Sequence, residues 1–138
     1  MMKKTTVFMA LSVAVLAASP AFPAQEESDT VSTELDACLA TPQGQTTAGM
    51  VDCTHAAYLA YDRQLNEVYK RVLAAVDGKS AGAIRESQRK WVAWREAQKA
   101  ADNGPWRADK GSLASLDIEA FSVDAIRARI RELQYYAP

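Results

Sequence analysis

A long helix-forming segment spans residues 46–78 and limits what this chain can fold into. It contains no proline, and its apolar residues return every three or four positions. Such spacing places apolar side chains on one face of an α-helix, which must then pack against other helices. The repeating positions are Met50, Cys53, Ala57, Tyr61, Leu65, Val68, Val72 and Val76. We predict one long helix that is capped by Thr46 or Thr47 and ended by Asp77 and Gly78.

Three further segments have helical character, and no segment alternates with period two for more than a few residues. We expect a short helix over residues 34–40 capped by Thr33, a long helix over residues 81–102 capped by Ser80, and a last helix over residues 116–135. Short turns between helices favour antiparallel neighbours. The sequence therefore predicts an all-α fold, a small antiparallel bundle of three main helices with a short N-terminal helix.

The two later helices are less regular than the first. The inward side of the segment 81–102 is expected to carry Ile84, Ser87, Gln88, Trp91, Trp94, Arg95 and Gln98. The apolar stripe of the last helix is Val123, Ile126, Ile130, Leu133 and Ala137. We expect Arg127, Arg129 and Arg131 to face water or to reach acidic partners. Between these helices lies a polar loop, where we expect Trp106 to fold back over the edge of the core rather than to bind a ligand.

The start of the chain has the pattern of a secretory signal peptide. Lys3 and Lys4 precede an apolar run over residues 7–18, which is shorter than the ~20 residues needed to cross a bilayer. Small residues favour cleavage after Ala21, with Ala24 as the alternative site. A buried N-terminal helix is the competing interpretation, but an opening pair of lysines is unusual for one.

Cleavage leaves a chain long enough for one domain with one core. We predict a signal peptide over residues 1–21, a flexible lead over residues 22–32 and a single helical domain over residues 33–138. Two of the 16 basic residues lie in the signal, so 14 basic and 17 acidic residues remain and the net charge is −3. With no basic cluster, a nucleic-acid partner is not expected. The predicted location is the periplasm or the exterior, with no stable membrane anchor after cleavage.

Two cysteines, Cys38 and Cys53, remain in the predicted exported chain. An oxidising compartment favours one disulfide between them, which would tie the short helix to the start of the long one. The alternative is two unpaired buried thiols. Because a closed zinc site needs four nitrogen or sulfur ligands and His55 is the single histidine, we expect no metal and no cofactor.

Catalytic chemistry is not indicated. The sequence has no nucleophile-elbow, zinc-protease or phosphate-loop motif. Any histidine-based triad would have to use His55, which lies two residues after Cys53 and is expected on the helix surface. We predict that the protein is not an enzyme.

Polar residues on the apolar faces are more informative. Asn66, Gln88 and Arg95 are costly to bury unless they form hydrogen bonds. We expect them to form a polar network between the two long helices, in which Asp62 pairs with Arg95. Such a network would fix the register of the helices; direct contact with a ligand is the alternative.

A spaced set of residues runs through both long helices. It consists of Cys53, Tyr58, Asp62, Leu65, Asn66, Tyr69, Gln88, Trp91 and Arg95. This set, preceded by the segment Thr47–Asp52, resembles the LprI-like lysozyme-inhibitor family over about residues 36–133. The resemblance implies a small, exported, helical, disulfide-bonded protein of the bacterial envelope, in a family with many members known only as a domain of unknown function. It implies no catalytic residues, and we interpret the set as structural.

The sequence departs from this family in one respect. Many members have two further cysteines, and the corresponding places here hold Lys99 and Phe121. The absence of both is expected if a whole disulfide has been replaced. We expect Phe121 to compensate by packing apolar area, and the loop that contains Trp106 to be less restrained.

The resemblance leads to two functional hypotheses. A protein inhibitor of lysozyme must block a cleft that contains two carboxylates. On grounds of exposure, Trp106, Arg107 and Lys110 are the candidate contacts with such a protein partner. The alternative is a periplasmic interaction or stress module that binds another protein and has no role with lysozyme.

Overall fold

The computed structural model describes residues 29–137, and over this range the chain is helical without a strand. The predicted all-α fold is confirmed. The elements are α1 (Thr30–Leu39), α2 (Thr47–Ala75), α3 (Gly78–Asp102), the 3-10 helix η1 (Pro105–Asp109) and α4 (Leu113–Tyr136). The predicted signal peptide and residues 22–28 of the predicted lead lie outside the described residues. Among the helices of residues 29–137, none combines the length and the apolar character needed to cross a membrane.

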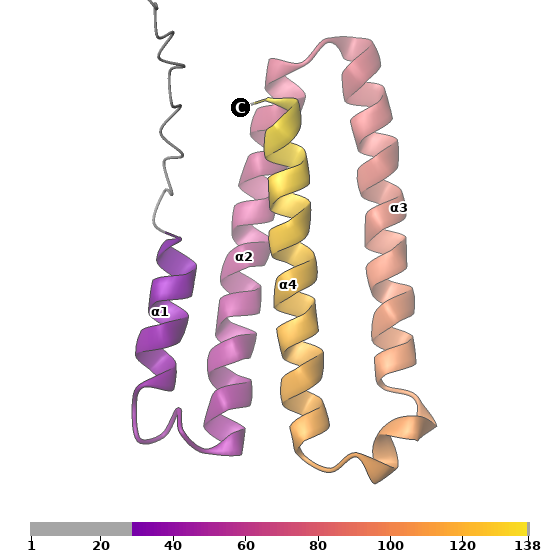
Figure 1. Ribbon diagram of the computed structural model, residues 1–138. Coiled ribbons are helices and arrows are strands. Elements are labelled where there is room, and N and C mark those ends of the chain that lie inside the picture. The colour runs from indigo at the N-terminus through magenta and orange to yellow at the C-terminus, as the bar shows by residue number, and fades with distance from the viewer. Residues whose placement is uncertain (1–28, 138) are drawn as a thin grey trace, which may run out of the picture.

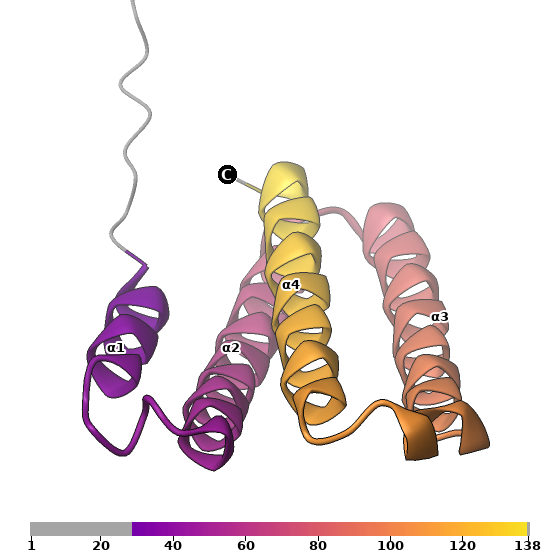
Figure 2. The ribbon, with the colours of Figure 1, turned by 60° about the horizontal axis from the view of Figure 1, so that its bottom comes forward.

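Helices α2 and α4 form the centre of the molecule (Figure 1). They lie side by side and run in the same direction, because α3 returns the chain between them. Helix α1 packs on one side of this pair and α3 lies on the other, as the turned view also shows (Figure 2). Successive long helices are therefore antiparallel, as predicted, but the closest packing joins α2 to α4 rather than to its sequence neighbour α3.

The hydrophobic core is the seam between α2 and α4. Tyr61 is 2% exposed, while Ile126 and Leu133 are fully buried. The other buried members of this cluster are Ala57, Leu65, Val68, Val72, Ile84, Val123 and Ile130. Ile84 is the one buried member from α3. The predicted stripe of the long helix is thus confirmed over its central turns, and its outer members Met50 and Val76 are half-buried.

Helix α1 starts four residues earlier than predicted. Its cap is Asp29, whose carboxylate accepts a hydrogen bond from the Ser32 backbone N–H at 3.2 Å. The Thr33 hydroxyl, which we expected to cap the helix, instead donates to the Asp29 carbonyl within the first turn. Residues 30–32, which we assigned to the flexible lead, are therefore helical. Asp29 is the better cap because its carboxylate is also held by contacts from distant parts of the chain, described below.

Helix α3 also starts before its predicted cap. Asp77, rather than Ser80, occupies the capping position and accepts the backbone N–H groups of Lys79 and Ser80 at 2.9 and 3.0 Å. The Ser80 hydroxyl donates to the same carboxylate at 2.6 Å. These hydrogen bonds, with the side chain of Ser80 first, lower the pKa of Asp77. An acidic residue at a helix N-terminus is favoured by the orphan N–H groups and by the helix dipole.

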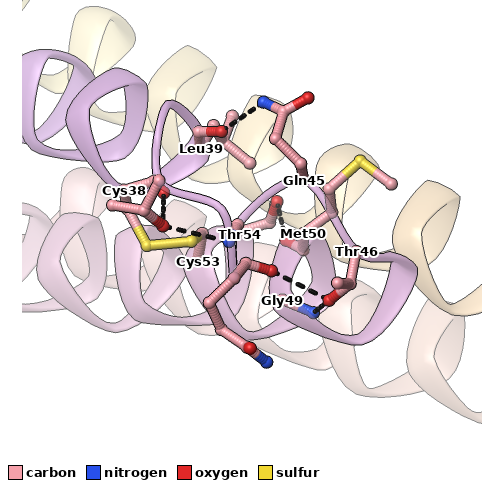
Figure 3. Close-up of a disulfide and its surroundings, with 11 residues drawn as sticks. Cys38, Leu39, Gln45, Thr46, Gly49, Met50, Cys53 and Thr54 are labelled. Atoms are coloured by element: carbon pink, nitrogen blue, oxygen red, sulfur yellow. Dashed lines mark hydrogen bonds between the residues drawn. A yellow bond between two sulfur atoms is a disulfide. The ribbon is translucent and has the colours of Figure 1, made fainter.

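A disulfide joins the end of α1 to the start of α2, as predicted (Figure 3). The Cα atoms of Cys38 and Cys53 are 5.8 Å apart. Close by, the Thr46 hydroxyl caps α2 by accepting the Gly49 backbone N–H at 3.0 Å. A Cβ at Gly49 would clash with the Gln43 carbonyl, so glycine lets the connection pass close to α2. Because α1 has no fully buried residue, the disulfide is its firmest attachment at this end.

Replacing both Cys38 and Cys53 by serine should lower the free energy of unfolding. The disulfide closes a loop with a sequence separation of 15 residues, and such a loop is worth about 3 kcal/mol in the chain-entropy account. Urea unfolding followed by circular dichroism measures the difference. An unchanged unfolding midpoint would contradict a stabilising role. Reduction of the unmodified protein is the matched control, since it opens the same loop without a substitution.

The other end of α1 is held by a cluster of three side chains, which we call the α1 clamp: Asp29, Tyr61 and Arg127. The buried Tyr61 hydroxyl donates to the Asp29 carboxylate at 2.5 Å. The Arg127 guanidinium lies 3.5 Å from the same carboxylate and 5.6 Å from the centre of the Tyr61 ring. Burial, followed by the hydrogen bond to Asp29, raises the pKa of Tyr61 to about 12. The clamp therefore ties α1 to both central helices.

The α1 clamp should weaken at alkaline pH. The pKa of Tyr61 rises from 10.0 to about 12 on folding, so its contribution is complete below pH 10 and is lost as the pH rises toward 12. Tyr61→Phe should cost about 1 kcal/mol below pH 10. The difference from the unmodified protein should shrink above that pH. Urea unfolding across this range measures it, with Tyr135→Phe as the exposed control; a difference that is independent of pH would contradict the assignment.

Candidate functional site

A cleft of about 500 Å³ lies between α3 and the α2–α4 pair, toward the end where η1 joins α3 to α4. Helix α3 packs against the core near its own start, where its two buried residues, Ala81 and Ile84, are found. Its C-terminal half borders the cleft instead. The cleft therefore exists because α3 contacts the central pair closely only over its first turns.

In the wall of the cleft, Arg95 links α3 to α2. Its guanidinium donates to the Asp62 carboxylate at 3.1 Å and to the Tyr58 hydroxyl. It also lies between two aromatic rings, 5.4 Å from the centre of Tyr58 and 4.9 Å from that of Trp91. Burial raises the pKa of Tyr58, and the nearby Arg95 charge partly opposes this rise. The structure thus forms the Asp62–Arg95 pair expected from the sequence.

A second arginine, Arg129, links α4 to α3 from a buried position. It is 4% exposed. Its guanidinium donates to Gln88 at 2.8 Å, to Glu132 at 2.9 Å and to Ser87 at 3.1 Å. It also lies 6.0 Å from the centre of the Trp91 ring. Of the two outcomes expected for Arg129, facing water or reaching an acidic partner, the structure shows the second, because the buried guanidinium pairs with Glu132.

The position of Arg129 in the sequence already indicates that it is buried. It follows the buried Ile126 by three positions and precedes Leu133 by four, so it lies on the apolar stripe. Of the network expected between α2 and α3, the structure forms the Asp62–Arg95 pair, whereas Gln88 bonds to Arg129 of α4 instead. Asn66 is not a link between helices: it is exposed and donates to the carbonyl of Asp62 within α2 at 2.8 Å.

Replacing Arg129 by alanine should destabilise the fold, because it leaves the side chains of Gln88 and Ser87 without the guanidinium that donates hydrogen bonds to them. Loss of hydrogen bonds to a charged group predicts a decrease of about 2 kcal/mol in the free energy of unfolding. Arg131→Ala, two residues along the same helix but exposed, is the matched control and should change stability by less than ~0.5 kcal/mol. Urea unfolding compares the two, and equal effects would argue against a structural role for Arg129.

The walls of the cleft carry two large apolar side chains that face solvent. Trp94 on α3 is 49% exposed, and Phe121 on α4 is 68% exposed. Trp94 lies on the side of α3 that borders the cleft, as expected, but it is not covered. The expectation that Phe121 packs as a replacement for a disulfide is wrong, because α3 stands off from α4 here. Lys99 also lines the cleft, so both places where the family resemblance suggested cysteines lie on its facing helices.

His55 also lines the cleft and bridges α2 to α4. Its Nδ1 lies 3.1 Å from a carboxylate oxygen of Glu119, and its ring stacks on Tyr58 with centres 5.9 Å apart. The neighbouring hydroxyls have other partners, since Ser122 donates to the Ile118 carbonyl and Ser115 is bonded to Arg107. Within residues 29–137 no group of three or more His, Cys, Asp or Glu side chains could hold a metal ion. Among the described residues, neither of these hydroxyls is hydrogen-bonded to His55.

The connection between α3 and α4 forms one end of the molecule (Figure 1). Its 3-10 helix η1 places Trp106 against the last turn of α3, where the indole N–H donates to the Ala101 carbonyl at 2.6 Å. Trp106 therefore folds back on α3 and not on the core edge, and it stays half-exposed. Gly111, with a φ of 69°, then turns the chain so that α4 begins at Leu113, three residues earlier than predicted.

The two basic residues that we predicted as partner contacts in this connection differ in how far their side chains are engaged by neighbours. Arg107 is half-buried and donates to Asn103 at 2.9 Å and to the Ser115 hydroxyl. These bonds tie η1 to both neighbouring helices. Lys110 is exposed, and within residues 29–137 it forms no ion pair. Of the three predicted contacts, Trp106 and Lys110 are therefore the more accessible.

Comparison with known proteins identifies relatives of this fold. A crystal structure of an uncharacterized protein from Burkholderia thailandensis is similar, with a TM-score of 0.71 and 22% sequence identity. The match covers 77% of this chain and 52% of that one, so the chain spans about half the length of its structural relative. At this identity the likeness concerns the fold alone.

Comparison of the sequence with protein-family models is more specific than this structural likeness. No curated protein matches the chain significantly. The family model described as "Lysozyme inhibitor LprI" matches residues 38–133, which include the disulfide, the Asp62–Arg95 pair and both walls of the cleft. This range covers most of the chain, and the activity in the family's description is inhibition rather than catalysis. The chain therefore belongs to the LprI lysozyme-inhibitor family.

Proposed function

We propose that this is an exported envelope protein that inhibits lysozyme through protein–protein contact at the connection between α3 and α4. The proposal is supported by the family match over residues 38–133. It is carried by one observation, that this connection forms an exposed end of the molecule and presents Trp106 and Lys110 to solvent. The signal-peptide pattern at the start of the chain supports export to the periplasm or beyond.

The chemistry of this end suits a carboxylate-lined cleft. Glycoside hydrolases of the lysozyme type hold two carboxyl groups on either side of the scissile bond. The Lys110 ammonium has three donors and no ion-pair partner in the described chain. The Trp106 ring in the same connection offers apolar area of the kind that often anchors an interface. Arg107 would mainly hold η1 in position, because its guanidinium is engaged with Asn103 and Ser115.

The test is a titration of lysozyme activity on cell-wall substrate with the purified, disulfide-bonded protein. We expect stoichiometric inhibition, weakened about tenfold or more by Lys110→Glu, because a charge reversal opposes a carboxylate-lined cleft. The matched control is Lys79→Glu in the first turn of α3, an exposed lysine at the opposite end of the molecule. It should inhibit as well as the unmodified protein.

Two results would count against the proposal. Equal weakening by Lys110→Glu and Lys79→Glu would show that net charge rather than a contact at η1 matters. No inhibition at large excess, with the disulfide and the helical signal intact, would favour the alternative of an envelope interaction module with a different protein partner.

A further inference from the structure

The cleft beside α3 has the size and the walls of a small-ligand site. Its volume of about 500 Å³ lies within the range of roughly 300–1,000 Å³ that is common for pockets holding one small molecule. Trp94 and Phe121 both line this cleft, and they are 49% and 68% exposed. Exposed aromatic area gathered at one hollow offers faces that a ligand can cover.

The charges that line the cleft are balanced. They comprise three cations, Arg95, Lys99 and Arg107, and three carboxylates, Glu96, Asp102 and Glu119. Several already have partners in the chain: Arg95 pairs with Asp62, and Glu119 lies beside His55. Since charge complementarity selects charged partners, a cleft without excess charge favours a neutral ligand.

The uncharged polar groups of the lining can both donate and accept hydrogen bonds. The amide of Gln98 on α3 donates to Asp102 at 2.9 Å and leaves its carbonyl oxygen as an acceptor. Asn103 and Ser122 already have partners in the chain, but the second amide N–H of Asn103 can still donate and the Ser122 hydroxyl oxygen can still accept. A suitable ligand therefore carries many hydroxyl or amide groups together with an apolar face. A sugar ring has both features, since its hydroxyls lie around the edge and its C–H groups form a face that can pack on an aromatic ring.

We propose that this cleft binds a short neutral saccharide, with the C–H face of a ring against Trp94 or Phe121. A peptide fits the observations less well. An extended peptide needs a free strand edge, whereas the walls here are helices, and a helical peptide needs a continuous apolar groove. The saccharide site does not depend on lysozyme inhibition, because it uses the cleft walls rather than the exposed end at Trp106 and Lys110.

Titration calorimetry of the purified, disulfide-bonded protein with N,N′-diacetylchitobiose and with maltose tests this site without any lysozyme present. We expect saturable binding of at least one of these neutral disaccharides at one site. Trp94→Ala and Phe121→Ala should each weaken it about tenfold or more, as loss of an aromatic contact predicts. Both side chains are exposed, so neither change should unfold the protein, and circular dichroism checks this.

The control variant is Tyr136→Ala. Tyr136 is an aromatic residue of similar exposure, 47%, at the opposite end of α4 and outside the cleft lining. Its loss should leave saccharide binding unchanged. The proposal is overturned if the folded protein binds neither disaccharide, if binding survives both cleft substitutions, or if a neutral blocked tripeptide binds the cleft more tightly than either sugar. None of these results bears on inhibition of lysozyme, which is measured separately.

Discussion

The apolar seam between α2 and α4 is the interaction on which the rest of the structure depends. Ile126 and Leu133 of α4 are fully buried against the stripe of α2 that includes Tyr61 and Leu65. Burial of apolar area is the main favourable term in folding, at about 25 cal/mol per Å². No other pair of helices in the described chain packs as extensively. Helices α1 and α3 therefore attach to a pair that is already stable, and each does so by a different kind of contact.

Helix α1 is held at its two ends. The disulfide fixes its C-terminal end to α2, and the α1 clamp fixes its N-terminal end to both α2 and α4. Between them Val31 and Leu35 pack against the core without being fully buried. A helix of ten residues is marginal by itself in water. These attachments explain how so short and exposed a helix can keep one position.

Beyond its first turns, helix α3 is attached mainly through arginine side chains. Arg95 reaches Asp62 and Tyr58 on α2, while Arg129 of α4 reaches Gln88 and Ser87 on α3. Such contacts hold two helices at a distance set by long side chains, whereas apolar seams draw helices close together. The C-terminal half of α3 consequently stands apart from α4 and leaves the cleft. The cleft, which is the feature most open to binding, thus follows from the change from apolar packing to arginine contacts along α3.

The sequence by itself determined the helices, the disulfide and one ion pair. Helical periodicity is local, so the stripe from Cys53 to Val72 predicts both the long helix and its buried face. The tertiary structure decided the helix starts at Asp29 and Asp77, the burial of Arg129 and the exposure of Trp94 and Phe121. The clamp on Asp29, the bonds of Arg129 and the open cleft depend on partners distant in sequence. Whether an amphipathic residue is covered depends on how closely a neighbouring helix approaches, and spacing along one helix carries no information about that distance.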